Sequence, residues 1–148
     1  MPSMIVQEGD HDVIFVQSKI RETAKDTLSP SLFKTWYEEA HIPDLLGTPG
    51  VSAALRYVRS DIKSPEDEAS AVGDPTSGFP YLCVYPRIDY EWVHSETCEF
   101  VKVPLAHEML PGPRGAVFEV ADFVMGAYEV MHGVKNVGNF DGMFCRLL

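Results

Sequence analysis

An amphipathic segment with clear boundaries, residues 29–46, constrains the fold of this chain more than any other feature. Ser29 can cap the amino end of a helix, and Pro30 suits the first helical position, where its missing N–H costs nothing. Apolar residues then recur at three- and four-residue intervals: Leu32, Phe33, Trp36, Tyr37 and Ala40. They form one stripe that must be buried, so the pattern predicts a helix packed against a core.

The histidine at position 41 continues this stripe. Because Pro43 disfavours helical geometry at the residue before it, we expect the regular helix to end near His41. The imidazole would then lie at the rim of the core, beside an indole and a phenol, where a titratable group is a candidate acid or base. The alternative is a histidine at the edge of the core that only satisfies a backbone carbonyl or the helix end.

The rest of the chain predicts four strands and a second, shorter helix. Strands are expected at 12–20, 51–59, 80–88 and 116–125, and the helix at 89–100. Residues 60–78 are rich in Ser, Asp, Glu, Pro and Gly without periodicity, which predicts a long surface loop. The order of elements is typical of an α+β, ferredoxin-like fold: an antiparallel sheet with both helices on one face.

Apolar residues occupy both faces of the expected sheet. Tyr81, Cys83 and Phe123 share one face, while the other face holds Leu82, Val84, Phe118, Val120 and Val124. Because helices cover only one side of such a sheet, the second face needs another cover, and a second copy of the chain supplies it most simply. We therefore predict a homodimer in which two sheets face each other as a barrel.

Composition narrows the class of protein. The 148 residues suit one domain, placed at residues 1–135, with a tail at 136–148. The formal charge of −10 disfavours nucleic acid and anionic membranes as partners. The 3 cysteines are not spaced in pairs, which disfavours both a disulfide framework and a zinc site. No secretory signal and no membrane-spanning apolar run is seen, so we expect a cytoplasmic protein.

Other side chains are candidates for the same site. Tyr57 could place a phenol near a substrate oxygen, although packing also explains it, and its neighbour Arg56 must point to the opposite face of the strand. Trp36 and Tyr37 flank the histidine and could bind an aromatic substrate, with core packing as the alternative for Trp36. Asp44 could orient the imidazole or merely start the next turn.

A second group of candidates lies further along the chain. Tyr85, Trp92 and His94 are assigned to substrate binding, and His107 is a third catalytic candidate after His41 and Tyr57. Surface histidines are common, so a structural role is the alternative for both later histidines. No paired metal-binding motif, glycine-rich phosphate loop or nucleophile elbow is present, so no metal and no cofactor are expected.

The helix and the strand expected after it resemble a known family. The run WYEEAHIPDLL at 36–46, followed by Gly50 and by Arg56-Tyr57, looks like the helix-to-histidine signature of EthD-like dimeric α/β barrel proteins. The resemblance implies a ferredoxin-like fold, a dimer and a cleft with a histidine at the position of His41.

The segments PYL at 80–82 and LAHEMLPG at 105–112 look especially like the fungal members of that family, and the resemblance spans residues 12–130. Relatives of this barrel include cofactor-free monooxygenases, polyketide cyclases, decarboxylases and dehydratases. Such a resemblance implies a fold and a cleft but does not fix a substrate.

These observations lead to one main hypothesis and two alternatives. The main hypothesis is a cofactor-independent tailoring enzyme that acts on an apolar aromatic or polyketide-like metabolite. His41 would serve as its acid or base in decarboxylation, dehydration or cyclisation. The first alternative is a cofactor-free oxidoreductase or monooxygenase of the EthD type, and the second is a non-catalytic carrier of a reactive intermediate. A carrier needs no buried titratable group, whereas the enzyme needs His41 beside an empty pocket.

Overall fold

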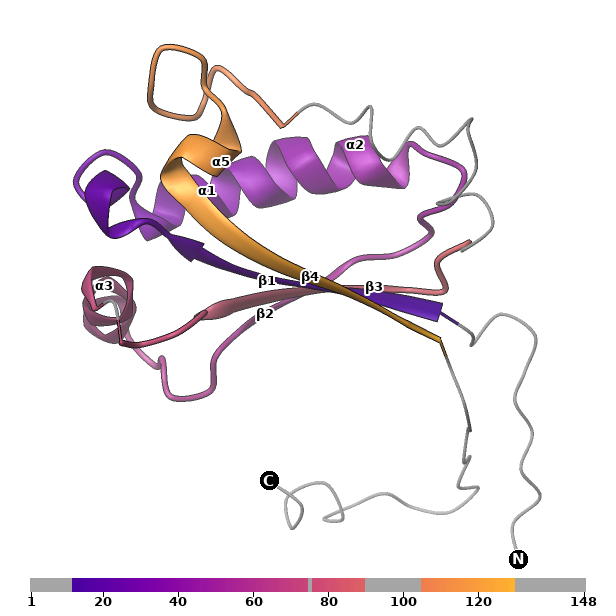
Figure 1. Ribbon diagram of the computed structural model, residues 1–148, viewed down its shortest axis with the longest axis horizontal. Helices are drawn as coiled ribbons and strands as arrows, with labels where there is room; N and C mark the ends of the chain where they lie inside the picture. The colour runs from indigo at the N-terminus through magenta and orange to yellow at the C-terminus, as the bar shows by residue number, and fades with distance from the viewer. Residues whose placement is uncertain (1–11, 75, 90–104, 130–148) are drawn as a thin grey trace, which may run out of the picture.

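A computed structural model describes residues 12–74, 76–89 and 105–129, and these residues form an α+β fold (Figure 1). In chain order the elements are β1 (Asp12–Ile20), η1 (Glu22–Ala24), α1 (Pro30–Thr35), η2 (Trp36–His41), α2 (Ile42–Leu46), β2 (Leu55–Val58), α3 (Pro65–Gly73), β3 (Tyr81–Pro86), α5 (Val117–Val120) and β4 (Ala121–Glu129).

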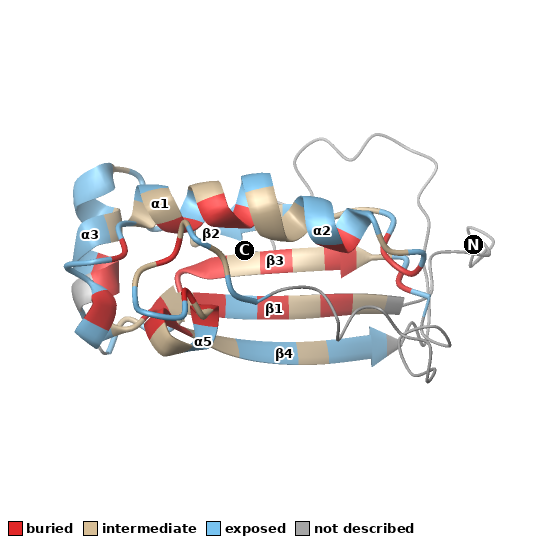
Figure 2. Cartoon of the chain, turned by 90° about the horizontal axis from the view of Figure 1, so that it is seen from above, coloured by how far each residue is buried: buried red, intermediate tan, exposed pale blue. Residues whose placement is uncertain are grey.

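The four strands form one sheet in the order β2-β3-β1-β4, and every neighbouring pair is antiparallel. The continuous run α1–η2–α2 lies along one face of this sheet (Figures 1 and 2). The predicted α+β class and antiparallel sheet are therefore confirmed. Strand β1 starts and ends as predicted, and β2 and β3 are shorter than the predicted strands.

The core lies between the helical run and the sheet. Its centre is Phe33, which is fully buried and makes ring contacts with Trp36, Tyr37, Tyr81 and Phe123. The sheet contributes alternate residues, since the same face of β1 and β3 supplies Ile14, Val16, Ile20, Tyr81, Cys83 and Tyr85. Burying each large side chain contributes about 1.5–3 kcal/mol, and this layer anchors the helix on the sheet.

The helix begins as predicted but does not end as predicted. The side-chain oxygen of Ser29 accepts a hydrogen bond from the backbone N–H of Leu32 at 3.0 Å. However, Ile42 keeps helical angles (φ −61°, ψ −46°), and the chain stays helical through Pro43 to Leu46. The expected stop near His41 is wrong, because the helix accommodates the proline by widening into the π-helical segment η2.

The predicted loop at 60–78 contains the helix α3, so that part of the prediction is wrong. Ser64 caps this helix by accepting a hydrogen bond from the N–H of Asp67 at 3.1 Å, and Pro65 follows in the first turn. The acidic residues of that turn lie at the positive end of the helix dipole and stabilise the helix. Ala71 and Val72 are buried, and the hydroxyl of Tyr81 donates to Glu68 at 2.6 Å, which fixes α3 against β3.

The strand predicted at 116–125 begins with one helical turn instead. The strand alternation predicted Val120 on the open face of the sheet, and this prediction is wrong. In α5 both Val117 and Val120 turn inward, and Val120 is only 6% exposed. Strand β4 then carries Val124, which is 49% exposed. The helix expected at 89–100 lies outside the described residues except for Asp89, which is not helical. Within the described part of the chain, no helix has the length and apolar character needed to cross a bilayer.

Candidate functional site

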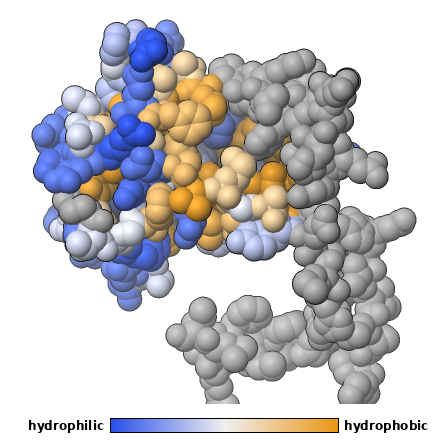
Figure 3. Space-filling model, in the orientation of Figure 1, coloured by the Kyte–Doolittle hydropathy of each residue, from blue (hydrophilic) through white to orange (hydrophobic). Residues whose placement is uncertain are grey.

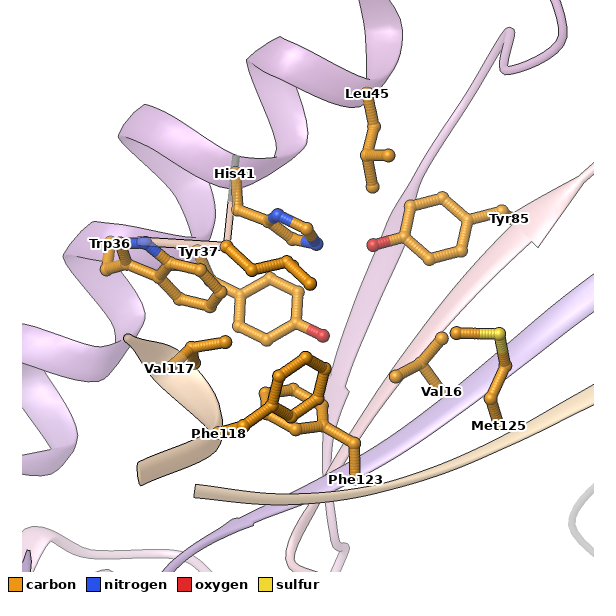
Figure 4. A pocket seen from close by; sticks show the side chains of 11 residues that line it. Val16, Trp36, Tyr37, His41, Leu45, Tyr85, Val117, Phe118, Phe123 and Met125 are labelled. Carbon is orange, nitrogen blue, oxygen red and sulfur yellow. The ribbon is translucent and has the colours of Figure 1, made fainter. Parts of the chain in front are cut away.

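A cavity of about 260 Å³ lies between the helical run and the sheet (Figure 4). Its described lining is almost wholly apolar and comes from η2, α2, α5, three strands and the segment before α5: Val16, Trp36, Tyr37, His41, Leu45, Tyr85, Leu105, Val117, Phe118, Phe123 and Met125. The polar atoms of this lining belong to one imidazole, two phenols and one indole, and no described residue in it carries a carboxylate, an ammonium or a guanidinium group. Such a wall selects an apolar molecule that carries a few polar groups.

The π-helical segment positions the imidazole of His41. Its ring stacks on the indole of Trp36, with centroids 4.8 Å apart and an angle of 14° between the planes. Trp36 and His41 are five residues apart. Because an α-helix turns by about 100° per residue, two such side chains would point in different directions, and the stack therefore needs a wider turn. The backbone N–H of Ile42 accordingly donates to the carbonyl of Tyr37, five residues back. Single π-helical turns of this kind are frequent at functional sites.

Pro43 explains why the helix widens at this point. Within a regular α-helix, its ring would clash with the carbonyl of Glu39, and it has no N–H to donate to that carbonyl. A π-helical turn moves the carbonyl away from the ring. The proline therefore brings His41 onto Trp36, whereas the sequence pattern suggested that it would only stop the helix.

The imidazole is neutral at physiological pH. Burial lowers the pKa of His41 to about 4, although the carboxylate of Asp44 acts in the opposite direction. Its Nδ1 atom is buried and has no hydrogen-bond partner among the residues that the structure describes. The ring of Tyr37 meets it edge-on at 5.3 Å. A neutral imidazole in an apolar wall can take a proton, and it is not charged in advance to give one.

Two phenols share the wall with the histidine. Figure 4 shows the hydroxyls of Tyr37, from η2, and Tyr85, from β3, both directed into the cavity. Burial raises the pKa of each well above the usual value for a phenol, so both stay protonated. The Tyr85 hydroxyl is buried and, within the described part of the chain, has no partner at hydrogen-bonding geometry. Unpaired buried polar groups are uncommon in proteins, and this hydroxyl is available to a ligand or a water molecule in the cavity.

A guanidinium that the sequence prediction left out lies behind this wall. Arg56 projects from the helix-facing side of β2, and its Cζ atom is 4.9 Å from the ring centroid of Tyr37 and 5.3 Å from that of Tyr81. Its Nη1 atom is 3.4 Å from a carboxylate oxygen of Glu38. The alternation of β2 already showed that Arg56 and Tyr57 face opposite ways, but it did not show which of them faces the helix.

The predicted site residues divide into two groups. Trp36, Tyr37, His41 and Tyr85 meet at the cavity. Tyr57 pairs with Leu82 on the opposite face of the sheet and is 49% exposed, so it does not reach His41.

The remaining candidates do not line the cavity. Asp44 is exposed beyond the π-helical turn and acts on His41 only through its charge. The Nδ1 atom of His107 accepts a hydrogen bond from the backbone N–H of Met109 at 3.0 Å, which is a local structural role. Trp92 and His94 lie outside the described residues.

The prediction missed most of the apolar wall. Val16 and Leu45 come from the strand and the amphipathic segment that the sequence predicted, and their periodicity could have indicated them. Val117 and Phe118 depend on α5, which the strand-like pattern concealed. Among the described residues no cluster of histidine, cysteine and acidic side chains suited to a metal ion occurs.

Comparison of the chain with models of protein families, with curated proteins and with solved structures finds no match in any of the three. The chemistry of the site must therefore be inferred from its own residues.

Proposed function

We propose that this protein is a cofactor-independent enzyme that transfers a proton within a small apolar, aromatic or polyketide-like molecule. One observation carries the proposal: a neutral imidazole, stacked on Trp36 and with its Nδ1 unpartnered among the described residues, lies in the wall of an otherwise apolar cavity. A carrier protein would need the apolar wall but not the base. The imidazole is unprotonated at neutral pH and can therefore accept a proton from carbon or oxygen, although its lowered pKa makes it a weaker base than a free histidine.

The chemistry depends on the state of this base. His41 takes a proton from a carbon next to a carbonyl and leaves an enolate on the substrate. The imidazolium then returns the proton, either to a departing hydroxide, which leaves as water, or to another atom of the rearranged substrate. Dehydration and cyclisation both fit this sequence, because neither requires an electron acceptor. The apolar wall strengthens the interactions that stabilise the transient charges.

The cavity also limits the size of the substrate. An apolar cavity of roughly 150 Å³ can hold a benzene molecule. On that scale, a cavity of about 260 Å³ corresponds to two fused rings. The aromatic side chains of the wall, Trp36, Tyr37, Phe118 and Phe123, would stack on flat ligands of this kind.

A model reaction tests the base without knowledge of the natural substrate. 5-Nitro-1,2-benzisoxazole is a two-ring compound whose ring opens when a base removes its one acidic C–H. The N–O bond then breaks and gives a coloured cyanonitrophenolate. We expect the wild-type protein to accelerate this reaction, and His41→Gln to remove about 10²-fold of the acceleration, since glutamine cannot accept the proton.

Tyr57→Phe, on the opposite face of the sheet, is the matched control and should keep the wild-type rate. Equal rates for folded wild type and folded His41→Gln would contradict the proposal. Tight binding of the benzisoxazole without ring opening would favour the carrier alternative.

The same proposal includes the finer architecture, a ferredoxin-like fold of the EthD-like type that dimerises through its open sheet face. The order β2-β3-β1-β4 and the helical run on one face support it. On the open face, Leu55, Tyr57, Val124 and Tyr128 are each about half exposed. Figure 3, which views the molecule from the β4 edge and not onto the open face, shows apolar residues over the middle of the molecule and hydrophilic ones at the α3 end.

A charge on this face tests the dimer. Light scattering at micromolar concentration should report twice the chain mass for the wild type and a monomer or an aggregate for Val124→Asp. Val124 is chosen rather than Val120, which the sequence also placed on this face, because Val120 is buried within its own chain. A wild-type monomer, or a Val124→Asp protein that remains a well-folded dimer, would refute this interface.

A further inference from the structure

Removal of a proton by His41 leaves a negative charge on the substrate, and the site needs a place for it. We propose that the hydroxyls of Tyr37 and Tyr85, backed by the guanidinium of Arg56, form an oxyanion site beside His41 in the cavity. The cavity would accordingly bind two-ring phenols and enols in their anionic form. This inference rests on the proposed function and specifies its substrate class.

The two hydroxyls supply the hydrogen bonds. Both are directed into the cavity in Figure 4, from different elements of the fold. The Tyr37 hydroxyl and the Cys83 thiol lie near the Tyr85 hydroxyl, but none of the described residues meets it at hydrogen-bonding geometry, so its proton is available to a ligand. Neither phenol is itself ionised at neutral pH, so each can donate to an oxyanion. Hydrogen bonds to a charged acceptor are roughly twice as strong as those between neutral groups, and they gain further in an apolar site.

Arg56 supplies the charge from behind the wall. The side chain of Arg56 is 14% exposed. Its guanidinium lies against the ring of Tyr37, and Tyr37 itself lines the cavity. Two of its nitrogens, Nε and Nη2, are buried without partners in the described part of the chain. Its ion-pair partner Glu38 has a side chain that is 45% exposed, so solvent weakens the compensation.

The field of this guanidinium reaches the phenols of the core. Arg56 acts to lower the pKa of Tyr37 and of Tyr81, although burial dominates and both values are raised. Burial likewise raises the pKa of the Cys83 thiol, and the charge of Arg56 acts in the opposite direction there too. A negative charge formed on a ligand beside Tyr37 would feel the same field.

Other charged groups lie on the outer side of Arg56 and do not enter the cavity. They line a second, polar cavity of about 390 Å³ between the helical run and α3: Lys34, Glu38, Lys63 and Glu68. The carboxylate of Glu68 accepts a hydrogen bond from Tyr81 at 2.6 Å. Because this set holds two cations and two anions, Arg56 is the charge left in excess behind the wall.

A ligand that reports its own ionisation tests the inference directly. 7-Hydroxycoumarin is a two-ring phenol whose neutral and anionic forms differ in their excitation spectra, and 7-methoxycoumarin has the same rings but cannot ionise. When the hydroxycoumarin is bound to the wild type, we expect its pKa to fall below the value in water. A unit charge about one ring away, at an effective dielectric constant of about 20, shifts an ionisation by roughly one pH unit.

Variants separate the charge from the fold. Arg56→Gln should raise the pKa of the bound probe by about one unit, back toward its value in water. Arg56→Lys keeps the charge and should largely keep the lowered pKa, and Tyr85→Phe should make the lowering smaller. Arg21→Gln removes an equal charge from the exposed pair with Asp122 and serves as the control, with Tyr57→Phe as the control for the phenol. The control variants Arg21→Gln and Tyr57→Phe should bind 7-methoxycoumarin as the wild type does, and the Arg56 and Tyr85 variants should still bind it, which shows that the cavity is intact.

Three outcomes decide between the two proposals. A bound pKa that is not lowered in the wild type, or is unchanged in folded Arg56→Gln and Tyr85→Phe, overturns the oxyanion site even if His41 opens the benzisoxazole. A lowered pKa that depends on Arg56 supports the oxyanion site even if the base reaction fails. If folded wild type binds neither coumarin, the inferred substrate class is wrong, and the benzisoxazole reaction alone decides the proposed function.

Discussion

The neutral state of His41 predicts how the stability of the protein depends on pH. In the unfolded chain a histidine takes up its proton near pH 6.5, whereas burial lowers the pKa in the folded protein to about 4. Between these values the unfolded chain binds a proton that the folded protein does not. The free energy of unfolding therefore falls as the pH drops from about 6.5 to about 4, and this contribution is fully present above pH 6.5.

The size of the effect comes from the same two values. Because one pKa unit is worth 1.36 kcal/mol, the complete loss is about 3 kcal/mol, and about 2.5 kcal/mol of it should be reached by pH 4.5. That is a large share of the roughly 5–15 kcal/mol by which a domain is stable. His41→Gln cannot take up the proton in either state, so the variant should lack this part of the pH dependence.

Urea unfolding of both proteins between pH 4.5 and 8, at one fixed protein concentration, measures the difference. Carboxylates also titrate in this range, but they do so in both proteins, and the difference between wild type and variant isolates His41. The reasoning is refuted if the two free energies of unfolding stay parallel across the whole range. It is also refuted if the histidine ring titrates near pH 6.5 in NMR spectra of the folded wild type.

Two further substitutions test the local geometry. Pro43→Ala supplies an N–H for the carbonyl of Glu39 and removes the clash, so η2 should return to α-helical spacing and the ring of Trp36 should leave that of His41. The pKa of His41, measured by NMR titration, should then rise toward 6.5. An unchanged pKa would show that the stack does not depend on the proline. Gly115→Ala should lower the free energy of unfolding by about 1–3 kcal/mol, because Gly115 has φ +57° and an added Cβ would overlap the carbonyl of His107. Gly78→Ala is its control, with a positive φ of +73° and nothing within 4 Å of the added atom, so it should cost less; equal losses would contradict the assigned overlap.

The sequence was most predictive where one local signal decided the structure. The strand at 12–20 and the capped start of the helix at Ser29 and Pro30 follow from periodicity and from single-residue preferences. The meeting of Trp36, Tyr37 and His41 was also predicted, because all three lie on one buried stripe. Such features need no knowledge of the rest of the fold.

The sequence misled where two local signals competed or where distant packing decided. Pro43 has a strong local preference against a helix, but the π-helical turn and the packing of the aromatic stripe on the sheet overcame it. Residues 65–73 have only a weak apolar pattern. The Ser, Asp, Glu, Pro and Gly content of the region therefore led to the prediction of a loop, although Ser64 and Pro65 are typical of the start of a helix. The turn of α5 resembles a strand in sequence because valine and phenylalanine favour strands, while its burial against the core is a property of the tertiary structure.

The unpaired polar groups around the cavity are the strongest link between this fold and a function. Each buried donor or acceptor without a partner costs about 1–3 kcal/mol, and leucine or phenylalanine at the same positions would avoid that cost. Here the groups at His41, Tyr85 and Arg56 lie on three different elements around a single apolar core. Independent packing faults would be scattered through the core, whereas these three gather at one cavity wall and the layer behind it. A polar ligand bound in the cavity would supply partners for His41 and Tyr85 directly, while Arg56, behind the wall, would act on that ligand through its charge.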